Sequence, residues 1–394
     1  MILKLIFFAS FIILFYNYVG YGLLLLVLVK IKRWYRRDTP ADTFMEPPVT
    51  LLVAAYNEED FIREKVTNTL ELDYPADKLH IIYITDGSSD RTPDIIKEYP
   101  RVQLLHENAR RGKTAAINRA MAHVTTPYVI FCDANTLLNK EAIRNIVKHY
   151  ADAQTGGVAG EKKVVASGDA NAASTEGVYW KYESLLKKWD AELYSVVGAA
   201  GELFSVRTEL YEQVEPEVVL DDFIISLRIC QKGFRIAYAP DAFAMESPSA
   251  SITEEHKRKV RISAGGFQSI VKLKALLNIF RYPLLSFQYI SHRVLRWTLS
   301  PLSLPILFVS NLLLVWTEPQ VWLWQLVLAL QLCFYGAAIT GYFLANRNIK
   351  SKPFYIPFYF LFMNIAVFQG FFRFITKRQA AAWEKSRRLV AVKS

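Results

Sequence analysis

Apolar positions are concentrated at the two ends of the chain, and a mixed pattern fills the middle. Ile2 to Val29 is almost continuously apolar, and three more apolar segments lie near the other end, at Thr298–Trp316, Val321–Leu344 and Pro353–Ile375. These lengths are close to or above the roughly 20 residues that a helix needs to cross a bilayer. The sequence therefore predicts membrane segments on both sides of a domain of another kind.

Between about Glu46 and Ala250, short apolar runs alternate with polar helical stretches. This alternation predicts an α/β fold, a Rossmann-like and mostly parallel sheet with helices on both faces. The expected strands are Val49–Ala54, His80–Thr85, Val102–His106 and Tyr128–Cys132. The expected helices are Glu59–Leu72, Pro93–Tyr99, Lys113–His123 and Lys140–Tyr150. Such sheets bind their ligands at the carboxyl ends of the strands.

The second half of the middle domain and the segment after it are less regular. Helix patterns occur at Val178–Tyr194 and Asp222–Lys232, with a strand or loop at Glu202–Arg207. A basic helical stretch follows at Glu254–Leu277. Ile279–Trp297 then mixes aromatic residues with Arg and His. This last mixture is typical of a helix that lies in a membrane interface.

Positive charge gathers beside the apolar segments. The formal net charge is +10, and the basic residues at these flanks are Lys30, Lys32, Arg33, Arg36, Arg37, Arg281, Arg293 and Arg296. Because cytoplasmic flanks of membrane segments carry an excess of Lys and Arg, we expect the middle domain in the cytoplasm and the N-terminus outside. The middle domain has no basic stripe interleaved with aromatic residues, so we expect no nucleic acid among its partners.

The topology is clear at the N-terminus and open at the C-terminus. The first apolar run is too long for a signal peptide, and its basic block follows it, so a retained membrane helix is favoured. Three crossings after a cytoplasmic domain would place the tail outside, although the tail is basic at Lys377, Arg378, Lys385, Arg387 and Arg388. Either the last segment, interrupted by Pro357, Asn364 and Gly370, is re-entrant, or the tail departs from the positive-inside tendency.

The cysteines and histidines of the sequence show no spacing typical of a metal site. The three cysteines, Cys132, Cys230 and Cys333, form no C-x-x-C pair, and the six histidines show no H-E-x-x-H spacing. A disulfide framework, a thiolate metal site and a zinc site are therefore not supported.

Polar residues follow several of the expected strands. Asn57 and Glu58 come after the first, Asp86 after the second and Asp133 after the fourth. In a parallel sheet these positions share one rim, where carboxylates suit ribose hydroxyls, base edges and a divalent cation on a pyrophosphate. Helix capping explains a single acidic loop residue such as Asp90 equally well. As a set, the residues indicate a ligand rim.

Six motifs in order resemble the signatures of glycosyltransferase family 2. They are VTLLVAAYNEE at 49–59, TDGSSDRT at 85–92, GKTAAIN at 112–118, FCDANT at 131–136, GAAGELFSVR at 198–207 and LDDF at 220–223. The resemblance covers roughly Val49 to Gln268. The flanking membrane helices are similar to those of the synthase branch, which includes the cellulose, hyaluronan and poly-N-acetylglucosamine synthases. The resemblance implies a GT-A fold and an inverting transfer from a nucleotide sugar.

The resemblance also assigns roles to residues of this chain. It places the uridine at Ala54, Asn57, Glu58 and Asp86, and the donor diphosphate near Lys113, Arg258 and Arg261. Asp133 and Asn135 occupy the D-x-D positions that bind nucleotide and Mg²⁺ or Mn²⁺. Gly201, Glu202 and Asp221 lie on the acceptor side, and Asp222 matches the general base. The pair Asp221-Asp222 also fits as first-turn charge of the helix that follows.

Two positions depart from the family pattern. Asn135 replaces the second Asp of D-x-D, which removes one negative charge from the cation site and makes another ligand, such as Glu246, a candidate. Ile262 stands where the synthases' Q-x-x-R-W motif has Trp, an aromatic platform for the acceptor sugar. Its loss argues against processive polymerisation.

These features predict a hexosyltransferase of the plasma (inner) membrane, multi-pass, with its catalytic domain cytoplasmic. It would move a hexose or N-acetylhexosamine from a UDP-sugar to a growing polysaccharide or lipid-linked glycan, with the bilayer and auxiliary export proteins as partners. A single addition to a polyprenyl or other lipid acceptor is the alternative. A non-catalytic membrane scaffold of an export complex is an alternative of another class, and the few charges in the apolar segments argue against independent transport.

The implied division of the chain has five parts. They are an N-terminal transmembrane helix with its basic flank (1–46), a GT-A catalytic domain (47–250), basic and interfacial helices (251–297), C-terminal transmembrane segments (298–378) and a basic tail (379–394).

Overall fold

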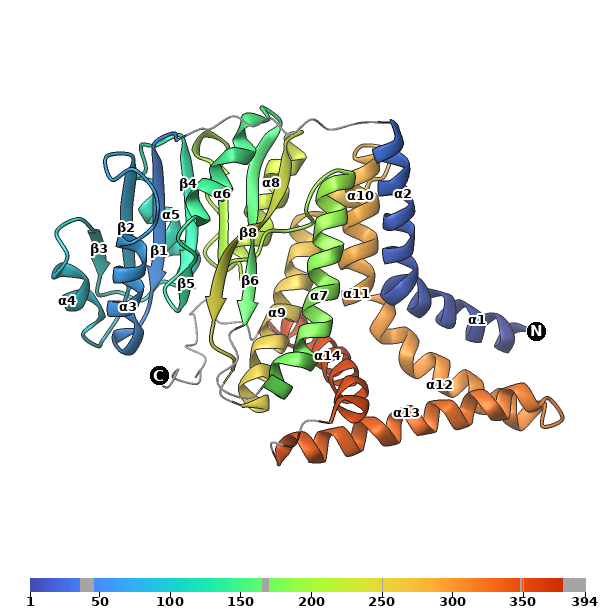
Figure 1. The fold of residues 1–394 in the computed structure, drawn as a ribbon. Coiled ribbons are helices and arrows are strands. Elements are labelled where there is room, and N and C mark those ends of the chain that lie inside the picture. Colours follow the sequence, from blue (N-terminus) through green and yellow to red (C-terminus); the bar gives the residue numbers. More distant parts are fainter. Residues whose placement is uncertain (36–45, 165–169, 250, 348, 350, 378–394) are drawn as a thin grey trace.

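The computed structural model describes residues 1–35, 46–164, 170–249, 251–347, 349 and 351–377. Within these residues eight strands form one sheet in the order β3-β2-β1-β4-β7-β6-β8-β5 (Figure 1). The strands are β1 Val49–Ala55, β2 Leu79–Asp86, β3 Gln103–Glu107, β4 Tyr128–Asp133, β5 Thr136–Leu138, β6 Thr155–Val164, β7 Leu203–Arg207 and β8 Arg235–Glu246. Strands β3, β2, β1 and β4 are parallel to one another, as are β6 and β8, whereas β7 and β5 run antiparallel to their neighbours. The prediction of a mostly parallel sheet is confirmed.

The sequence analysis did not predict β5, β6 or β8. For β6 the strand pattern is weak because close packing requires glycines in it. Its Gly157 has no room for a side chain, because a Cβ there would lie 2.8 Å from the carbonyl oxygen of Ser205. At Gly160 a Cβ would lie 2.8 Å from the side chain of Leu203. Glycines in a strand weaken its sequence pattern but allow a neighbouring backbone to approach closely.

Helices cover both faces of the sheet (Figure 1). Those of the sheet domain are α3 Glu59–Leu70, α4 Thr92–Lys97, α5 Lys113–Met121, α6 Ala142–Val147, α7 Ala170–Leu193 and α8 Asp221–Gln231. Along β1 the buried side chains alternate between two apolar cores, with Leu52 and Ala54 on the face of α5 and α8, and Leu51 and Val53 on the face of α3 and α6. This burial on both sides is what a parallel sheet requires.

Four segments of the described chain are helices long and apolar enough to cross a membrane. They are Ile2–Tyr35, which comprises α1 Ile2–Phe15, a π-helical turn at Tyr16–Gly20 and α2 Tyr21–Tyr35, together with α12 Leu299–Thr317, α13 Trp322–Asn346 and α14 Lys352–Ile375. Helices α1, α12 and α13 project away from the sheet, whereas α2 runs beside the sheet domain (Figure 1). The chain changes direction at the π-helical turn, which is a common cause of a helix kink.

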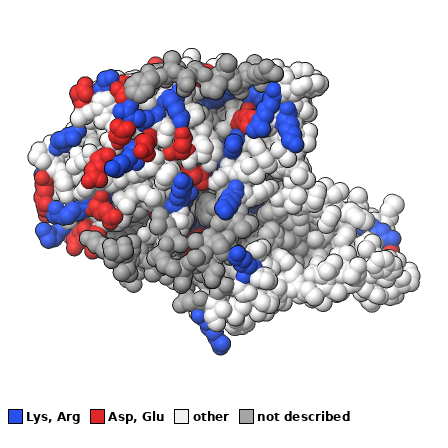
Figure 2. All heavy atoms as spheres, in the orientation of Figure 1, with Lys and Arg blue, Asp and Glu red and all other residues white. Residues whose placement is uncertain are grey.

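Charge follows the same division of the molecule. On the face seen in Figure 2, Lys, Arg, Asp and Glu crowd over the sheet domain, and the projecting lobe is nearly bare until its far tip. Lys4 of α1 and Glu318 at the end of α12 form an ion pair of 2.9 Å. A lobe with an uncharged waist and a charged tip is typical of a membrane-crossing bundle.

Helices α9 Ile252–Lys272, α10 Pro283–Tyr289 and α11 Leu295–Trp297, with a π-helical turn at Ile290–Val294, connect the sheet to the lobe. Helix α14 packs against α9, and Gly370 permits the contact. A Cβ on Gly370 would lie 2.5 Å from the Cβ of Ser263 and 2.8 Å from the backbone nitrogen of Ala264. Helix α14 is therefore fixed to a helix that borders the sheet domain.

We predict that Gly370→Ala lowers the stability of the purified protein by about 1–3 kcal/mol, because overpacking forces two backbones apart. Gly336→Ala in α13 is the matched control, since nothing lies within 4 Å of the Cβ it would add. That change should leave the melting temperature unchanged or raise it, because Ala is the better helix former. Thermal unfolding in detergent compares the two, and equal melting temperatures would contradict the α9–α14 contact.

Candidate functional site

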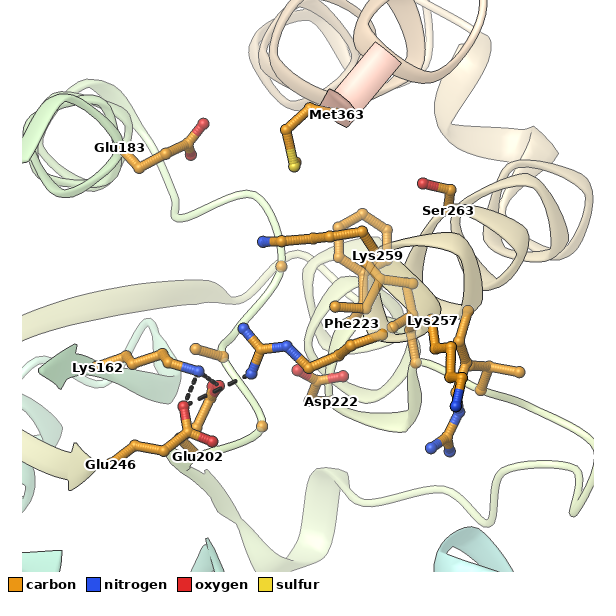
Figure 3. Close-up of a pocket in the computed structure, with 18 of the residues that line it drawn as sticks. Lys162, Glu183, Glu202, Asp222, Phe223, Glu246, Lys257, Lys259, Ser263 and Met363 are labelled. Carbon is orange, nitrogen blue, oxygen red and sulfur yellow. Dashed lines mark hydrogen bonds and ion pairs between the residues drawn. The ribbon is translucent and has the colours of Figure 1, made fainter. Parts of the chain in front are cut away.

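A cavity of about 1230 Å³ opens at the carboxyl ends of β1 and β4 and extends to α9, α11 and α14. Most of the residues expected in the site line it: Asn57, Glu58, Lys113, Asp133, Asn135, Gly201, Glu202, Asp221, Asp222, Arg258 and Arg261. Figure 3 shows part of this lining, with Asp222 and Glu202 on one side and Met363 of α14 on the other. Segments far apart in the sequence thus share one space.

Ala54 and Asp86 are not among the described lining residues, although each contacts a residue or loop that belongs to the site. Ala54 is buried in β1, where it pairs in register with Asp133 of β4. The carboxylate of Asp86 accepts hydrogen bonds from the backbone N–H groups of Arg111 (2.9 Å) and Gly112 (2.6 Å). Asp86 therefore fixes the loop that leads into Lys113.

The loop after β1 forms the outer end of the cavity. Asn57 has a positive φ of 52°, which Asn tolerates better than most residues. Its side-chain oxygen accepts a hydrogen bond from the backbone N–H of Ser89 at 2.8 Å, which ties the loops after β1 and β2 together. Nearby, the Arg110 guanidinium lies 4.0 Å from the ring centroid of Tyr56, and both residues line the cavity. The sequence analysis assigned no role to this stacked pair.

Lys113 stands at the centre of the acidic groups. Its Nζ donates to Oδ1 of Asp133 at 2.6 Å. A Cβ on Gly201 would lie 3.2 Å from Oδ2 of Asp222 and 3.7 Å from Nζ of Lys113, so these groups meet around the Gly201 backbone. Although burial opposes its charge, the carboxylates of Asp133, Asp221 and Asp222 raise the pKa of Lys113, which keeps it cationic.

Asp221 and Asp222 open α8 and face the cavity from its first turn. Desolvation and the negative charge of Asp221 raise the pKa of Asp222 well above that of an ordinary carboxyl group, while Lys113 opposes the rise. Among the described residues, Oδ2 of Asp221 is buried without a hydrogen-bond partner. The helix N-terminus stabilises negative charge at both positions. Asp221 and Asp222 therefore act as first-turn charges of α8 and also line the cavity.

A buried ion cluster closes the cavity beside Glu202. Lys162 of β6 is almost fully buried; its Nζ donates to Oε1 of Glu202 at 2.6 Å and pairs with Glu246 of β8 (Figure 3). Arg258 lies 3.6 Å from Glu246. The sequence analysis missed Lys162 because it recognised no strand at that position.

Asp133 and Asn135 are the metal ligands that the motif predicts. Among the described residues there is no cluster of three His, Cys, Asp or Glu side chains that could hold a metal by itself. Glu246, the candidate additional ligand, is instead paired with Lys162 and Arg258. One carboxylate and one amide oxygen still fit Mg²⁺ or Mn²⁺, which bind through one or two carboxylates while substrate phosphates and water complete the coordination.

The opposite end of the cavity is lined by residues that the sequence analysis treated as packing or membrane-facing. The α14 residues are Tyr355, Ile356, Tyr359, Phe360, Met363, Asn364 and Val367. Arg293, Arg296 and Trp297 line it from the helical turns before α12. Trp297 packs edge-to-face on Phe223, with ring centroids 5.5 Å apart, so an indole lies beside the Asp222 turn although position 262 is Ile.

Comparison with known proteins supports a common ancestry for the sheet domain. Residues 50–215 match the model of the family described as "Glycosyl transferase family 2". The chain is 27% identical over 252 residues to the "Probable glycosyltransferase YdaM" of Bacillus subtilis, a match that covers 60% of this chain and 58% of that protein. It is 27% identical over 249 residues to the "Poly-beta-1,6-N-acetyl-D-glucosamine synthase" of Staphylococcus aureus, covering 60% of this chain and 59% of that one. The chain thus spans less than two thirds of the length of these relatives.

The fold is shared over almost the whole chain with a solved structure. This is the mannosyltransferase PcManGT from Pyrobaculum calidifontis in complex with GDP-Man and Mn²⁺, with a TM-score of 0.71 and 24% identity over 95% of this chain and 99% of that one. The similarity confirms the expected arrangement of a mixed, mostly parallel sheet with attached apolar helices.

We predict that Lys162→Met destabilises the protein by about 3–5 kcal/mol, because it removes the buried cation closest to the carboxylates of Glu202 and Glu246, while Arg258 stays 3.6 Å from Glu246. Lys232→Met is the control, since Lys232 pairs with Glu212 at the surface (2.9 Å), where a lost ion pair costs less than about 1 kcal/mol. Denaturant unfolding of the solubilised protein measures both. A Lys162→Met protein as stable as the control would show that the cluster contributes little.

Proposed function

Because the sheet domain of this chain belongs to glycosyl transferase family 2, we propose that the protein transfers a hexose or N-acetylhexosamine from a UDP-sugar to an acceptor hydroxyl, with inversion at the anomeric carbon. The observation that carries this proposal is the meeting of Asp222, Lys113 and Asp133 around Gly201. A carboxylate suited to act as a base and a cation thus both lie beside the Gly201 backbone.

The donor occupies the end of the cavity near the sheet. Asn57 and Glu58 form the rim for the nucleoside, and the stacked pair of Tyr56 and Arg110 offers a flat cationic surface beside it. Lys113 contacts the diphosphate, and Arg258 and Arg261 of α9 reach the same cavity with guanidinium groups suited to phosphate oxygens. Asp133 and Asn135 would hold a divalent cation, which would neutralise the diphosphate and improve it as a leaving group.

Asp222 acts as the general base. Its carboxylate removes the proton of the acceptor hydroxyl while the acceptor oxygen bonds to the anomeric carbon from the face opposite the diphosphate. The bond between the anomeric carbon and the diphosphate oxygen breaks, and Lys113 stabilises the charge that collects there. A raised pKa suits this role, because a more basic carboxylate takes a proton more readily.

We propose that this chemistry takes place at the cytoplasmic face. Helices α1, α12 and α13 would cross the bilayer, and Lys32 and Arg33 at the end of α2 would lie on the side of the sheet domain. Helix α14, fixed to α9 through Gly370, would stay at the cytoplasmic surface instead of crossing. This re-entrant arrangement would keep Lys377 on the cytoplasmic side, in agreement with the positive-inside tendency, and the basic tail after it lies outside the described residues.

The acceptor is a lipid-linked or growing glycan, and single addition to a lipid is the second candidate. The observation that favours the second candidate is the apolar lining of the cavity by α14. Gel analysis of products made by the purified enzyme from a radiolabelled donor distinguishes a ladder of long chains from a single addition.

We predict that Asp222→Asn lowers transfer by about 10²–10⁴-fold while donor binding stays within a factor of about two, because the amide cannot accept the proton. Release of nucleoside diphosphate from a panel of UDP- and GDP-sugars, with Mn²⁺, Mg²⁺ or chelator, first identifies the donor. The surface variant Asp94→Asn serves as the control. Unchanged turnover by Asp222→Asn would remove Asp222 from the mechanism.

The pH profile provides a second prediction. Transfer needs Asp222 as the carboxylate, so activity falls as the pH drops through its pKa in the folded protein. Because this pKa is raised, the acid limb lies above the range near pH 4 where an ordinary Asp titrates. Asp221→Asn removes the neighbouring negative charge and should move the limb to lower pH, measured as kcat/KM against pH. A limb that stays in place would exclude Asp222 as the titrating group.

A further inference from the structure

We propose that Gln268 of α9 is a positioning residue for the transfer, because it holds the segment 217–220 that leads directly into Asp222. The inference rests on the proposed role of Asp222 as the general base and identifies a group that keeps this base in place. Gln268 is not among the described lining residues of the cavity, so its effect on the reaction passes through Asp222.

The side-chain amide of Gln268 binds the backbone of this segment at two points. Its Nε2 donates to the carbonyl oxygen of Glu217 at 3.0 Å, and its Oε1 accepts a hydrogen bond from the backbone N–H of Val219 at 3.1 Å. Glutamine can make both bonds because its amide carries a donor and an acceptor, whereas Met has no donor there. A substitution of Gln268 by Met therefore removes both bonds and keeps most of the side-chain volume.

A second helix holds the residue between these two points. Oγ1 of Thr114 donates to the carbonyl oxygen of Val218 at 3.1 Å. Thr114 belongs to the first turn of α5 and directly follows Lys113. The residues from 217 to 219 are thus bonded both to α9 and to the helix that begins with Lys113.

Helix α9 also packs closely against the segment. Gly265 lies three positions before Gln268, on the same face of α9. A Cβ on Gly265 would lie 2.8 Å from Cγ of Leu220 and 3.0 Å from Cβ of Val219. Glycine permits this approach because it has no side chain. Packing and hydrogen bonds therefore hold the segment to the same helix face.

The start of α8 depends on this segment. Leu220 is the N-cap residue of α8 and makes no side-chain capping hydrogen bond. Because no such cap fixes the first turn, the position of that turn follows from how the residues before it are held. Asp222 lies in this turn and lines the cavity. Loss of the bonds from Gln268 should therefore displace the base.

The displacement should affect the chemical step and spare donor binding. Arg258 and Arg261, the proposed diphosphate contacts on α9, are about two turns or more away from Gln268 along the helix. A general base must lie within hydrogen-bond reach of the proton that it removes, and a misplacement of about 1 Å can lower a rate about 100-fold. We therefore expect a lower kcat at an unchanged KM for the donor.

The test measures nucleoside diphosphate release by the full-length protein in nanodiscs, with the nucleotide sugar found active in the donor panel and with water as the acceptor. Gln268→Met should lower kcat about 10–100-fold, with the KM for the donor unchanged within about twofold.

Lys272→Met is the matched control, one turn farther along the same face of α9. Lys272 pairs with the side chains of Glu215 (3.3 Å) and Glu217 (3.2 Å). Its loss leaves the backbone bonds of the segment intact, so it should change kcat by less than about twofold.

A double variant separates positioning from a general loss of structure. In the Asp222→Asn protein, Gln268→Met should lower the remaining rate by less than about twofold, because the displaced side chain is no longer a base. Losses that multiply would show that Gln268 acts independently of Asp222.

Gln268→Glu keeps the test decisive if the Met variant does not fold. It preserves the shape of the side chain and the bond from Val219, but it places a carboxylate oxygen against the carbonyl oxygen of Glu217. It should therefore also lower kcat and leave the donor KM unchanged.

A kcat of the Gln268 variants equal to that of Lys272→Met would overturn the inference and leave the proposed function intact. A changed donor KM at an unchanged kcat, or losses that multiply in the double variant, would do the same. Unchanged turnover by Asp222→Asn, or no release from any nucleotide sugar, would instead reject the proposed function, and this inference with it.

Discussion

The site depends on one electrostatic constraint: the ammonium group of Lys113 lies among the carboxylates of Asp133, Asp221 and Asp222 and offsets part of their mutual repulsion. Asp133 is bonded to it at 2.6 Å, and Asp221 and Asp222 act on it from the first turn of α8. Neighbouring carboxylates in a desolvated space raise each other's pKa unless a cation compensates. Lys113 therefore offsets part of the repulsion between the carboxylates that line this end of the cavity.

The fold supplies this arrangement through simple geometry. Parallel pairing of β1 with β4 places Ala54 against Asp133, and the end of β2 brings Asp86 under the loop before Lys113. Asp86 accepts hydrogen bonds from the backbone N–H groups of Arg111 and Gly112, and these bonds fix the loop from which α5 begins. Lys113 is the first residue of α5. The register of the sheet thus determines where the cation stands. Asp86, which the sequence analysis placed in the donor site, is for this reason also necessary to the geometry of the loop before Lys113.

Much of the sheet and of the candidate site could be predicted from the sequence, because both are encoded in short local segments. Strands β1, β2 and β4 are encoded as short apolar runs, and a polar rim residue (Asn57, Asp86 or Asp133) stands at or just after the end of each. The motif resemblance then assigned roles to Asp133 and Asp222, which the structure brings into one cavity. Asp86 and Ala54 are not among the described lining residues, and their donor-binding roles stay predictions.

The remainder could not be predicted because it depends on contacts between distant segments. Strand β6 needs glycines for a close approach to β7, and so its Lys162 had no place in the sequence pattern. Arg293 and Arg296 read as membrane flank, yet Glu183 of α7, more than a hundred positions earlier, holds Arg296 at the cavity wall. The face of α14 that lines the cavity is set by the contact of this helix with α9, which the sequence pattern alone does not reveal.

The most direct test of the account is an electron cryo-microscopy map of the protein with a non-transferable UDP-sugar analogue and Mn²⁺. The quantity to measure is the position of the diphosphate and of the anomeric carbon relative to Lys113 and Asp222. The account predicts the diphosphate beside Lys113 and Asp133, with the Asp222 carboxylate on the opposite face of the anomeric carbon. A diphosphate bound away from Lys113, or an anomeric carbon on the far side of the cavity from Asp222, would contradict it.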